Sequence, residues 1–119
     1  MIPARQAAER RGRRAETYAA LWLNAKGYRV LARQWRTGRG EVDLIARRGQ
    51  VLVAIEVKTR ANATLAIEAV SPRQRRRIAR AAQAYLSRLP DATKLSLRFD
   101  VVVVVPWRLP QHIVGAWEG

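Results

Sequence analysis

The sequence predicts an α/β fold in which helices flank a mixed central sheet. Segments with helical periodicity stand at the N-terminus and in the second half of the chain, with three consecutive strand-like segments between them. A further strand-like segment near the C-terminus is apolar throughout, which is typical of a strand buried on both faces. At 119 residues and 49% hydrophobic, the chain has the size of one domain, 1–119.

The first expected helix spans residues 5–26 and ends at Gly27, a residue type that favours helix termination. Apolar side chains recur along it at i, i+3, i+4 and i+7, and we expect this stripe to face the core. The stripe consists of Tyr18, Leu21, Trp22 and Ala25. Glu16 lies off the polar stripe, so we expect its carboxylate to turn partly away from solvent. The alternative for residues 1–13 is a flexible basic arm.

Three strands are expected next. Residues 28–36 alternate apolar and charged side chains, and residues 37–40 supply a glycine-rich turn. Residues 41–47 and 51–59 follow as two strands with a short turn, 48–50, between them. Their lengths and the turn predict an antiparallel hairpin.

The second half of the chain contains the crossover. Residues 61–70 have no clean period, and we expect a mobile loop or a frayed lead-in to a helix. Ser71 and Pro72 suit an N-cap and first helical position, and the helix should stop before Pro90. Its expected buried face consists of Ile78, Ala81, Ala82, Tyr85 and Leu89.

The last segments complete the sheet. Residues 97–105 form the continuous apolar strand, and the helix before them is long enough for a right-handed crossover to a parallel neighbour. Residues 113–117 could add a short final strand. The predicted order is αβββαβ, with this last strand appended.

Charge and residue inventory narrow the function classes. Lys and Arg number 23 against 9 acids, a net charge of +14, which is typical of a protein that binds polyanions; nucleic acid is the leading partner. An anionic membrane surface is the alternative polyanion. No apolar run approaches the roughly 20 residues of a membrane-spanning helix, so no membrane segment is expected, and we do not count a membrane among the partners. The N-terminus lacks the apolar core of a secretory signal, which predicts a cytoplasmic location. With no cysteine and one histidine, His112, any bound metal should have oxygen ligands.

Three charged residues stand inside strands that otherwise have the composition of a buried sheet: Asp43, Glu56 and Lys58. An unpaired buried charge costs several kcal/mol, so such groups persist where they pair, bind metal or take part in chemistry. If the hairpin register brings Asp43 and Glu56 together, a hard divalent cation such as Mg²⁺ would relieve their repulsion. Lys58 would then stand beside the metal, where it could stabilise a developing negative charge or orient water. This arrangement suits phosphodiester hydrolysis.

Asp43, a gap of twelve residues and then Glu56-Val57-Lys58, after a helix that carries Glu16, resembles the PD-(D/E)XK nuclease superfamily. Longer strings are similar to the YraN-type bacterial proteins, over about residues 14–105. These strings are Gly-Glu-Val-Asp-Leu-Ile at 40–45, Val-Ala-Ile-Glu-Val-Lys-Thr-Arg at 53–60, Arg-Gln-Arg-Arg-Arg-Ile at 73–78 and Arg-Phe-Asp-Val-Val at 98–102.

The resemblance implies a restriction-endonuclease-like core related to the archaeal Holliday junction resolvases. It implies Glu16, Asp43 and Glu56 as ligands of Mg²⁺, with Mn²⁺ as a substitute, and Lys58 as the catalytic lysine. Gln74 would support the site from the second helix. The implied substrate is DNA, including branched or damaged structures. Resolvase-like proteins often act as dimers, so a homodimer is expected by analogy alone.

The chain departs from the pattern at four places. Val42 replaces the superfamily's proline, an exchange that the YraN-type proteins accept. Gln34 stands where relatives usually carry asparagine, Arg73 stands where they usually carry lysine, and residues 62–65 lack an expected glycine. The last two departures concern loop shape and substrate contacts rather than the metal site.

Arginines near the expected site are candidate phosphate contacts, since each cation that neutralises a phosphate releases counterions. They are Arg36, Arg39, Arg60, Arg73, Arg76 and Arg77. The alternative for the second helix is an ordinary solvated face. Trp35 could stack on a base, although packing at the sheet edge is the simpler expectation.

The acids also have structural alternatives. Asp43 and Glu56 could form ion pairs with Lys58 or a nearby arginine, and Glu16 could pair with an arginine of its own helix. We expect Glu41 to neutralise Arg39 or to bond the turn. We also expect Asp100 to pair or cap at a strand end, and His112 to lie at the surface. At the level of function, the alternatives to a nuclease are a noncatalytic nucleic-acid-binding protein with the same fold and, less favoured, a protein-interaction adaptor.

Overall fold

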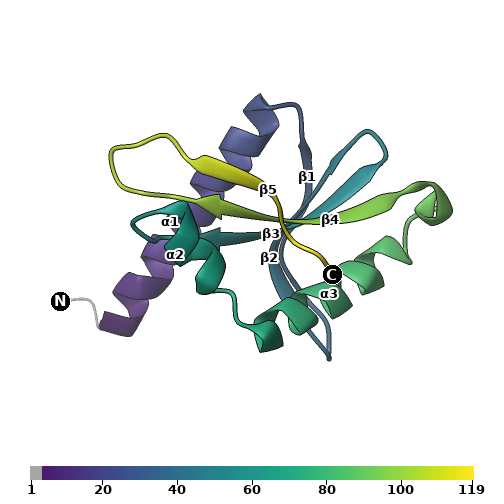
Figure 1. Cartoon of the computed structure of the whole chain (residues 1–119), viewed down its shortest axis with the longest axis horizontal. Coiled ribbons are helices and arrows are strands. Elements are labelled where there is room, and N and C mark those ends of the chain that lie inside the picture. The colour runs from purple at the N-terminus through teal and green to yellow at the C-terminus, as the bar shows by residue number, and fades with distance from the viewer. Residues whose placement is uncertain (1–3) are drawn as a thin grey trace.

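The computed structural model describes residues 4–119, and the side chains from residue 12 onward. Five strands form one mixed sheet in the order β1-β2-β3-β4-β5, with helices on both faces (Figure 1). The predicted fold class is confirmed. Of the possible basic arm 1–13, residues 1–3 lie outside the described residues, and from Ala4 onward the backbone is helical.

The helices and strands follow the predicted order, with additions. The first half of the chain contains α1 (Ala4–Ala25), β1 (Arg29–Arg36), β2 (Glu41–Arg48) and β3 (Val51–Lys58). The second half contains α2 (Ala63–Glu68), α3 (Pro72–Leu86), a 3₁₀ turn (Ala92–Lys94), β4 (Ser96–Val103) and β5 (Gln111–Trp117). None of the helices in the described part of the chain is both long and apolar enough to cross a membrane.

The strand pairings confirm the predicted topology. β2 and β3 form the antiparallel hairpin, with Leu44 opposite Ile55. β3 and β4 are parallel, and the chain between them passes through α2 and α3. β1 and β5 complete the two edges in antiparallel pairings. Alternate residues of the central strands therefore reach two separate cores, one under α1 and one under α2 and α3.

The expected core stripe of α1 is wrong. Tyr18 and Leu21 are 59% and 62% exposed, whereas Ala19 and Leu23 are fully buried against the sheet. The inward face consists of alanines together with Leu23, because alanines allow a close approach to the strands, and Tyr18 and Leu21 are left outside. Glu16 belongs to this inward face and is 8% exposed, so its predicted turn away from solvent is confirmed.

The segment 61–70 is not a loop but contains α2. The Asn62 side chain accepts a hydrogen bond from the Leu65 amide at 2.9 Å, so it caps the helix N-terminus. Ala66 and Val70 are buried in the core under the sheet, which stabilises a helix too short to persist alone. Asparagine is a favoured N-cap residue, so Asn62 was a signal for this helix that the prediction did not use.

The start of α3 is as predicted. Ser71 and Gln74 form a capping box, in which each side chain bonds the backbone amide of the other residue. The helix ends at Leu86, earlier than the expected stop before Pro90. Of the expected inward residues, three are fully buried and two are partly buried at the core: Ile78, Ala81 and Ala82, then Tyr85 and Leu89.

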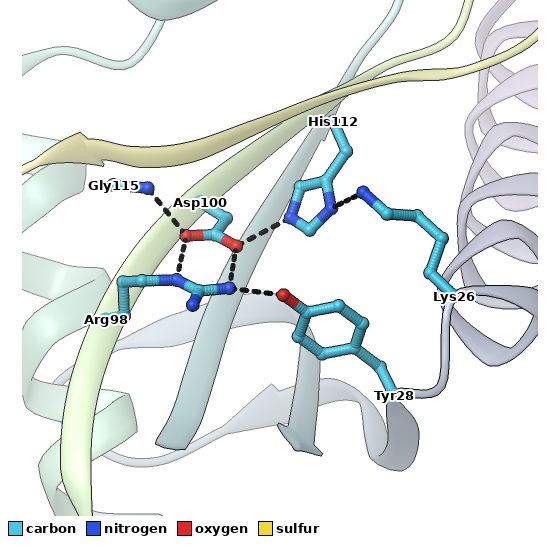
Figure 2. A network of polar contacts seen from close by, with 6 residues as sticks. All are labelled: Lys26, Tyr28, Arg98, Asp100, His112 and Gly115. Carbon is cyan, nitrogen blue, oxygen red and sulfur yellow. Dashed lines mark hydrogen bonds and ion pairs between the residues drawn. The ribbon is translucent and has the colours of Figure 1, made fainter. Parts of the chain in front are cut away.

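A buried polar cluster ties β4, β5 and the end of α1 together (Figure 2). We call it the Asp100 cluster; its members are Lys26, Tyr28, Arg98, Asp100, His112 and Gly115. Asp100 is fully buried, accepts two hydrogen bonds from Arg98 at 2.9 and 2.8 Å, and lies 2.6 Å from His112 Nε2. The expectation that Asp100 pairs is confirmed, but Asp100 lies inside β4 and not at a strand end as expected. The expected surface position of His112 is wrong, because its side chain is only 2% exposed.

The bonds of this cluster outweigh the cost of burying its carboxylate. Burial alone would raise the pKa of Asp100, but hydrogen bonds from His112 and Arg98 lower it below the ordinary value. The Gly115 amide adds a third donor at 2.9 Å. Through these bonds Asp100 links Arg98 of β4 to His112 and Gly115 of the edge strand β5.

Candidate functional site

The site lies where β2 and β3 separate. Beyond Leu44 and Ile55, the amide of Asp43 donates to the Glu56 carboxylate at 3.1 Å, and the amide of Val57 donates to the Asp43 carboxylate at 2.8 Å. Here carboxylate oxygens accept the hydrogen bonds from backbone amides that backbone carbonyls accept elsewhere in the β2–β3 ladder. The two acids are held between the strands, each fixed by a backbone amide.

The alternation of β2 breaks at the same point. Leu44 and Ala46 pack in the core under α1, whereas Val42 packs with Ile45 in the core under α3. A regular strand would place Val42 on the same side as Leu44. The break turns the strand around Asp43, so that Asp43 can be approached from both α1 and α3.

One pocket of about 380 Å³ brings together all five predicted site residues. They come from four elements, and their lining side chains are Glu16, Asp43, Glu56, Lys58 and Gln74. Asp43 and Glu56 lie opposite each other, as the motif spacing suggested. The Gln74 side chain is already engaged in the capping box, because its Oε1 accepts a hydrogen bond from the Ser71 amide at 3.2 Å. This bond restricts the supporting role that was expected of Gln74 in the site.

Electrostatics at the pocket favour a proton or a cation on the acid pair. Burial, followed by the neighbouring Asp43 carboxylate, raises the pKa of Glu56 from 4.5 to about 8. Burial also raises the pKa of Asp43, while the Val57 amide and Lys58 act in the opposite direction. The charge of Lys58 therefore compensates these carboxylates only in part.

Glu16 is held by a residue that the sequence reasoning did not assign to the site. Gln34 donates to both carboxylate oxygens of Glu16, at 3.3 and 3.2 Å, and lines the same pocket. Its φ of +49° lies in the left-handed region, which asparagine adopts more readily than most residues. The available signal was the departure at this position, where the resemblance implies asparagine and the chain has glutamine.

The donor set fits a cation held by two carboxylates. Mg²⁺ binds through one or two carboxylates and retains waters, which matches the Asp43 and Glu56 pair. Among the residues from 12 onward, no group of three or more His, Cys, Asp or Glu side chains is placed to hold a metal ion. Glu16 lines the pocket, and its pKa is raised by burial and, to a lesser extent, by Asp43, but its carboxylate is bonded by Gln34. The structure assembles a pair of acids with a third nearby, rather than a complete trio.

The predicted nucleic-acid contacts divide into two groups. Arg36, Arg60 and Arg77 line the pocket. The others, Arg39, Arg73 and Arg76, are exposed and do not line it. Glu41 pairs with Arg36 at 3.5 Å on the surface, not with Arg39 as expected.

Gly40 and Trp35 determine how closely α3 approaches this pocket. A Cβ atom on Gly40 would overlap the backbone carbonyl of Arg77, so only glycine permits the observed contact. The Trp35 indole donates to the Ala81 carbonyl at 2.9 Å and packs edge-on to Tyr85. Trp35 is therefore a packing residue, as the simpler expectation had it.

Comparisons with known proteins agree with the YraN-type resemblance. The model of the uncharacterised protein family UPF0102 matches residues 15–104. The UPF0102 protein of Paramagnetospirillum magneticum is 54% identical over 97% of this chain and 92% of its own length. That of Parvibaculum lavamentivorans is 53% identical over 94% of this chain and 84% of its own length, and that of Maricaulis maris is 52% identical over 98% and 92%. Placement in the nuclease superfamily stays a prediction. The chain belongs to the uncharacterised protein family UPF0102.

Proposed function

We propose that the protein is a Mg²⁺-dependent endonuclease that hydrolyses phosphodiester bonds in DNA. The observation that carries the proposal is the pair of buried carboxylates, Asp43 and Glu56, held between separating strands beside Lys58. The restriction-endonuclease-like order of elements supports it, as does the net charge of +14. Placement in the PD-(D/E)XK superfamily belongs to the same proposal.

The residues of the pocket would divide the chemistry among themselves. Asp43 and Glu56 would hold the metal, with Glu16 near it; Mg²⁺, or Mn²⁺ in its place, supplies Lewis acidity for the attack of water on phosphorus. The Lys58 ammonium stabilises negative charge that develops on the phosphate oxygens. Arg36, Arg60 and Arg77 bind and position the DNA backbone at the pocket, through charge-assisted bonds to phosphate.

Cleavage assays test the proposal directly. The purified protein should cleave at least one member of a panel of linear, flapped and four-way DNA in the presence of Mg²⁺ or Mn²⁺. Asp43→Asn should reduce cleavage to background, and Lys58→Ala should reduce the rate by about 100-fold to 1,000-fold, the usual cost of losing one transition-state donor. Circular dichroism of each variant checks that the fold is retained.

Two matched controls separate the site from general charge effects. Glu68→Gln removes an exposed acid on α2, and Lys94→Ala removes an exposed lysine near β4, both outside the pocket. Both should cleave as the wild type does. Absence of cleavage by the wild type on every substrate, or equal cleavage by Asp43→Asn, contradicts the proposal.

A second candidate is a nucleic-acid-binding protein without catalysis. It is favoured by one observation, that the described residues hold a pair of carboxylates rather than a full group of three metal ligands. Tight, salt-dependent binding of DNA without cleavage, in either metal, would select this alternative.

A further inference from the structure

A second pocket, of about 760 Å³, lies next to the candidate site. The loop between β4 and β5 and the outer side of α1 form it, and its side chains include Arg14, Tyr18, Thr59, Trp107, Arg108 and Leu109. Trp107 is fully exposed, and Tyr18 and Leu109 are 59% and 75% exposed. We call the residues that line this second pocket the Trp107 platform. Exposed aromatic and apolar groups gathered at one place usually mark a binding surface.

The backbone of Trp107 shows that its position carries a cost. The Arg108 amide donates to the Val105 carbonyl at 3.2 Å and closes a turn, with Pro106 in its second position. Trp107 occupies the third position with a φ of +65°, where glycine is the favoured residue. A bulky residue in this conformation is strained, and here it gains no burial in return. The indole therefore has no packing role that explains its presence.

The charge around the platform favours an anionic partner. Arg14 and Arg108 line it, and its described lining contains no acidic residue. Ala15 and Thr59 line both this pocket and the one that holds Asp43 and Glu56. A strand bound across the platform would therefore continue directly into the candidate site.

We propose that the Trp107 platform holds an unpaired stretch of DNA beside the phosphate to be cleaved. Bases stack on Trp107 and Tyr18, while Arg14 and Arg108 contact the phosphates. Single strands are bound in this way because their bases expose aromatic faces that are covered in a duplex. The inference rests on the proposed function and names its substrate class: DNA with a single-stranded flank or splayed end.

A second copy of this chain fits the platform less well. A twofold interface there would place Arg14 and Arg108 against the same patch of another molecule. Each molecule carries a net charge of +14, so this contact would be repulsive. DNA supplies the opposite charge together with the aromatic surface.

The test compares binding of two DNAs without divalent metal, so that cleavage plays no part. Fluorescence anisotropy measures the Kd for a blunt duplex and for the same duplex with a single-stranded flank. Trp107→Ala should weaken binding of the flanked DNA by about 10-fold, the usual effect of losing one aromatic stack, and leave blunt-duplex binding unchanged. Trp107→Phe should retain most of the affinity. Leu65→Ala, at an exposed apolar residue on α2, is the matched control and should bind as the wild type does.

The salt dependence separates stacking from charge. Trp107→Ala should leave the slope of log K against log salt unchanged, whereas Arg108→Gln should reduce it by about 0.7, the value for one phosphate of a single strand. Trp107→Gly suits the left-handed backbone and repeats the test if the alanine variant folds poorly.

Three results would overturn the inference: equal loss of affinity for both DNAs, no loss in either Trp107→Ala or Trp107→Gly, or unchanged DNA affinity with loss of a dimer in sedimentation. The last result would assign the platform to a second copy of the chain. Because binding is measured without metal, a protein that never cleaves can still pass this test. A protein that cleaves can equally fail it.

Discussion

At the scale of single residues, the acid pair shows why this site needs a positive partner. Asp43 and Glu56 are fixed by backbone amides between two strands, close enough for each charge to oppose the other. A proton on Glu56 relieves the repulsion in the metal-free protein, and a divalent cation would do so more completely. The same geometry that makes the pair a candidate site therefore makes it sensitive to pH.

The raised pKa of Glu56 predicts a specific dependence of stability on pH. The folded protein binds this proton more tightly than the unfolded chain, so the contribution is complete below pH 4.5 and is lost as pH rises through about 8. Relative to Glu56→Gln, the wild type should lose up to about 1.4 kcal/mol of unfolding free energy per pH unit in that window. Urea denaturation of both proteins from pH 5 to 9, without metal, measures the difference.

Magnesium should reverse this loss. At pH 9 the ion stabilises the ionised pair, so Mg²⁺ should raise the melting temperature of the wild type and have less effect on Glu56→Gln.

The pH prediction for the metal-free protein has its own contradicting outcome. If the unfolding free energies of the wild type and Glu56→Gln change with pH in parallel, the pKa of Glu56 is not raised.

At the scale of elements, the pocket depends on how closely helices approach the sheet. α1 buries alanines and Leu23 while leaving Tyr18 and Leu21 outside, so that Glu16 reaches the pocket from a tightly packed helix. α3 approaches the turn before β2 so closely that Gly40 meets the Arg77 carbonyl. Small residues at these contacts position the functional side chains that lie next to them.

Replacement of Gly40 should separate α3 from the site. Gly40→Ala forces the backbone of Arg77 to move, which should cost about 1–3 kcal/mol of unfolding free energy by overpacking. DNA affinity should fall with it, because Arg77 and Gln74 leave the pocket. Gly38→Ala, in the same turn with open space around it, is the control and should change neither quantity much. Urea denaturation and anisotropy measure the two effects, and equal behaviour of the two variants would argue against the close contact.

Sequence and structure agree best where the signal is local. The capping box at Ser71 and the hairpin turn between β2 and β3 depend on residues a few positions apart, and both are confirmed. The inward face of α1 was predicted wrongly, because its periodicity fits two faces and the sheet selects the one with small residues. α2 was missed because its stability comes from buried Ala66 rather than from a strong helical pattern.

At the scale of the whole molecule, charge is the dominant property. The chain of 119 residues carries a net charge of +14. The arginines that line the pocket with Asp43 and Glu56 come from β1, the segment after β3, and α3. Only some of the many arginines can contact one bound DNA, so salt dependence can identify them.

Arg77 and Lys94 should differ in this measurement. Arg77→Gln should reduce the slope of log K against log salt by about 0.9 for duplex DNA, because one phosphate contact is lost. Lys94→Gln, outside the pocket, should leave the slope unchanged although it removes the same charge. If both variants change the slope equally, binding is diffuse and the pocket has no special place in it.

The sequence by itself determined the fold class and, apart from α2, the order of elements, and it singled out Asp43, Glu56 and Lys58 as one candidate site. Such features follow from periodicity, turn chemistry and residue type, which act over short stretches of chain. Only the tertiary structure decided that β2 breaks its alternation at Asp43, that Gln34 holds Glu16, and that Trp107 stands beside the same pocket. These contacts join segments far apart in sequence, and packing of the two helical layers against one sheet places them, which no local pattern encodes.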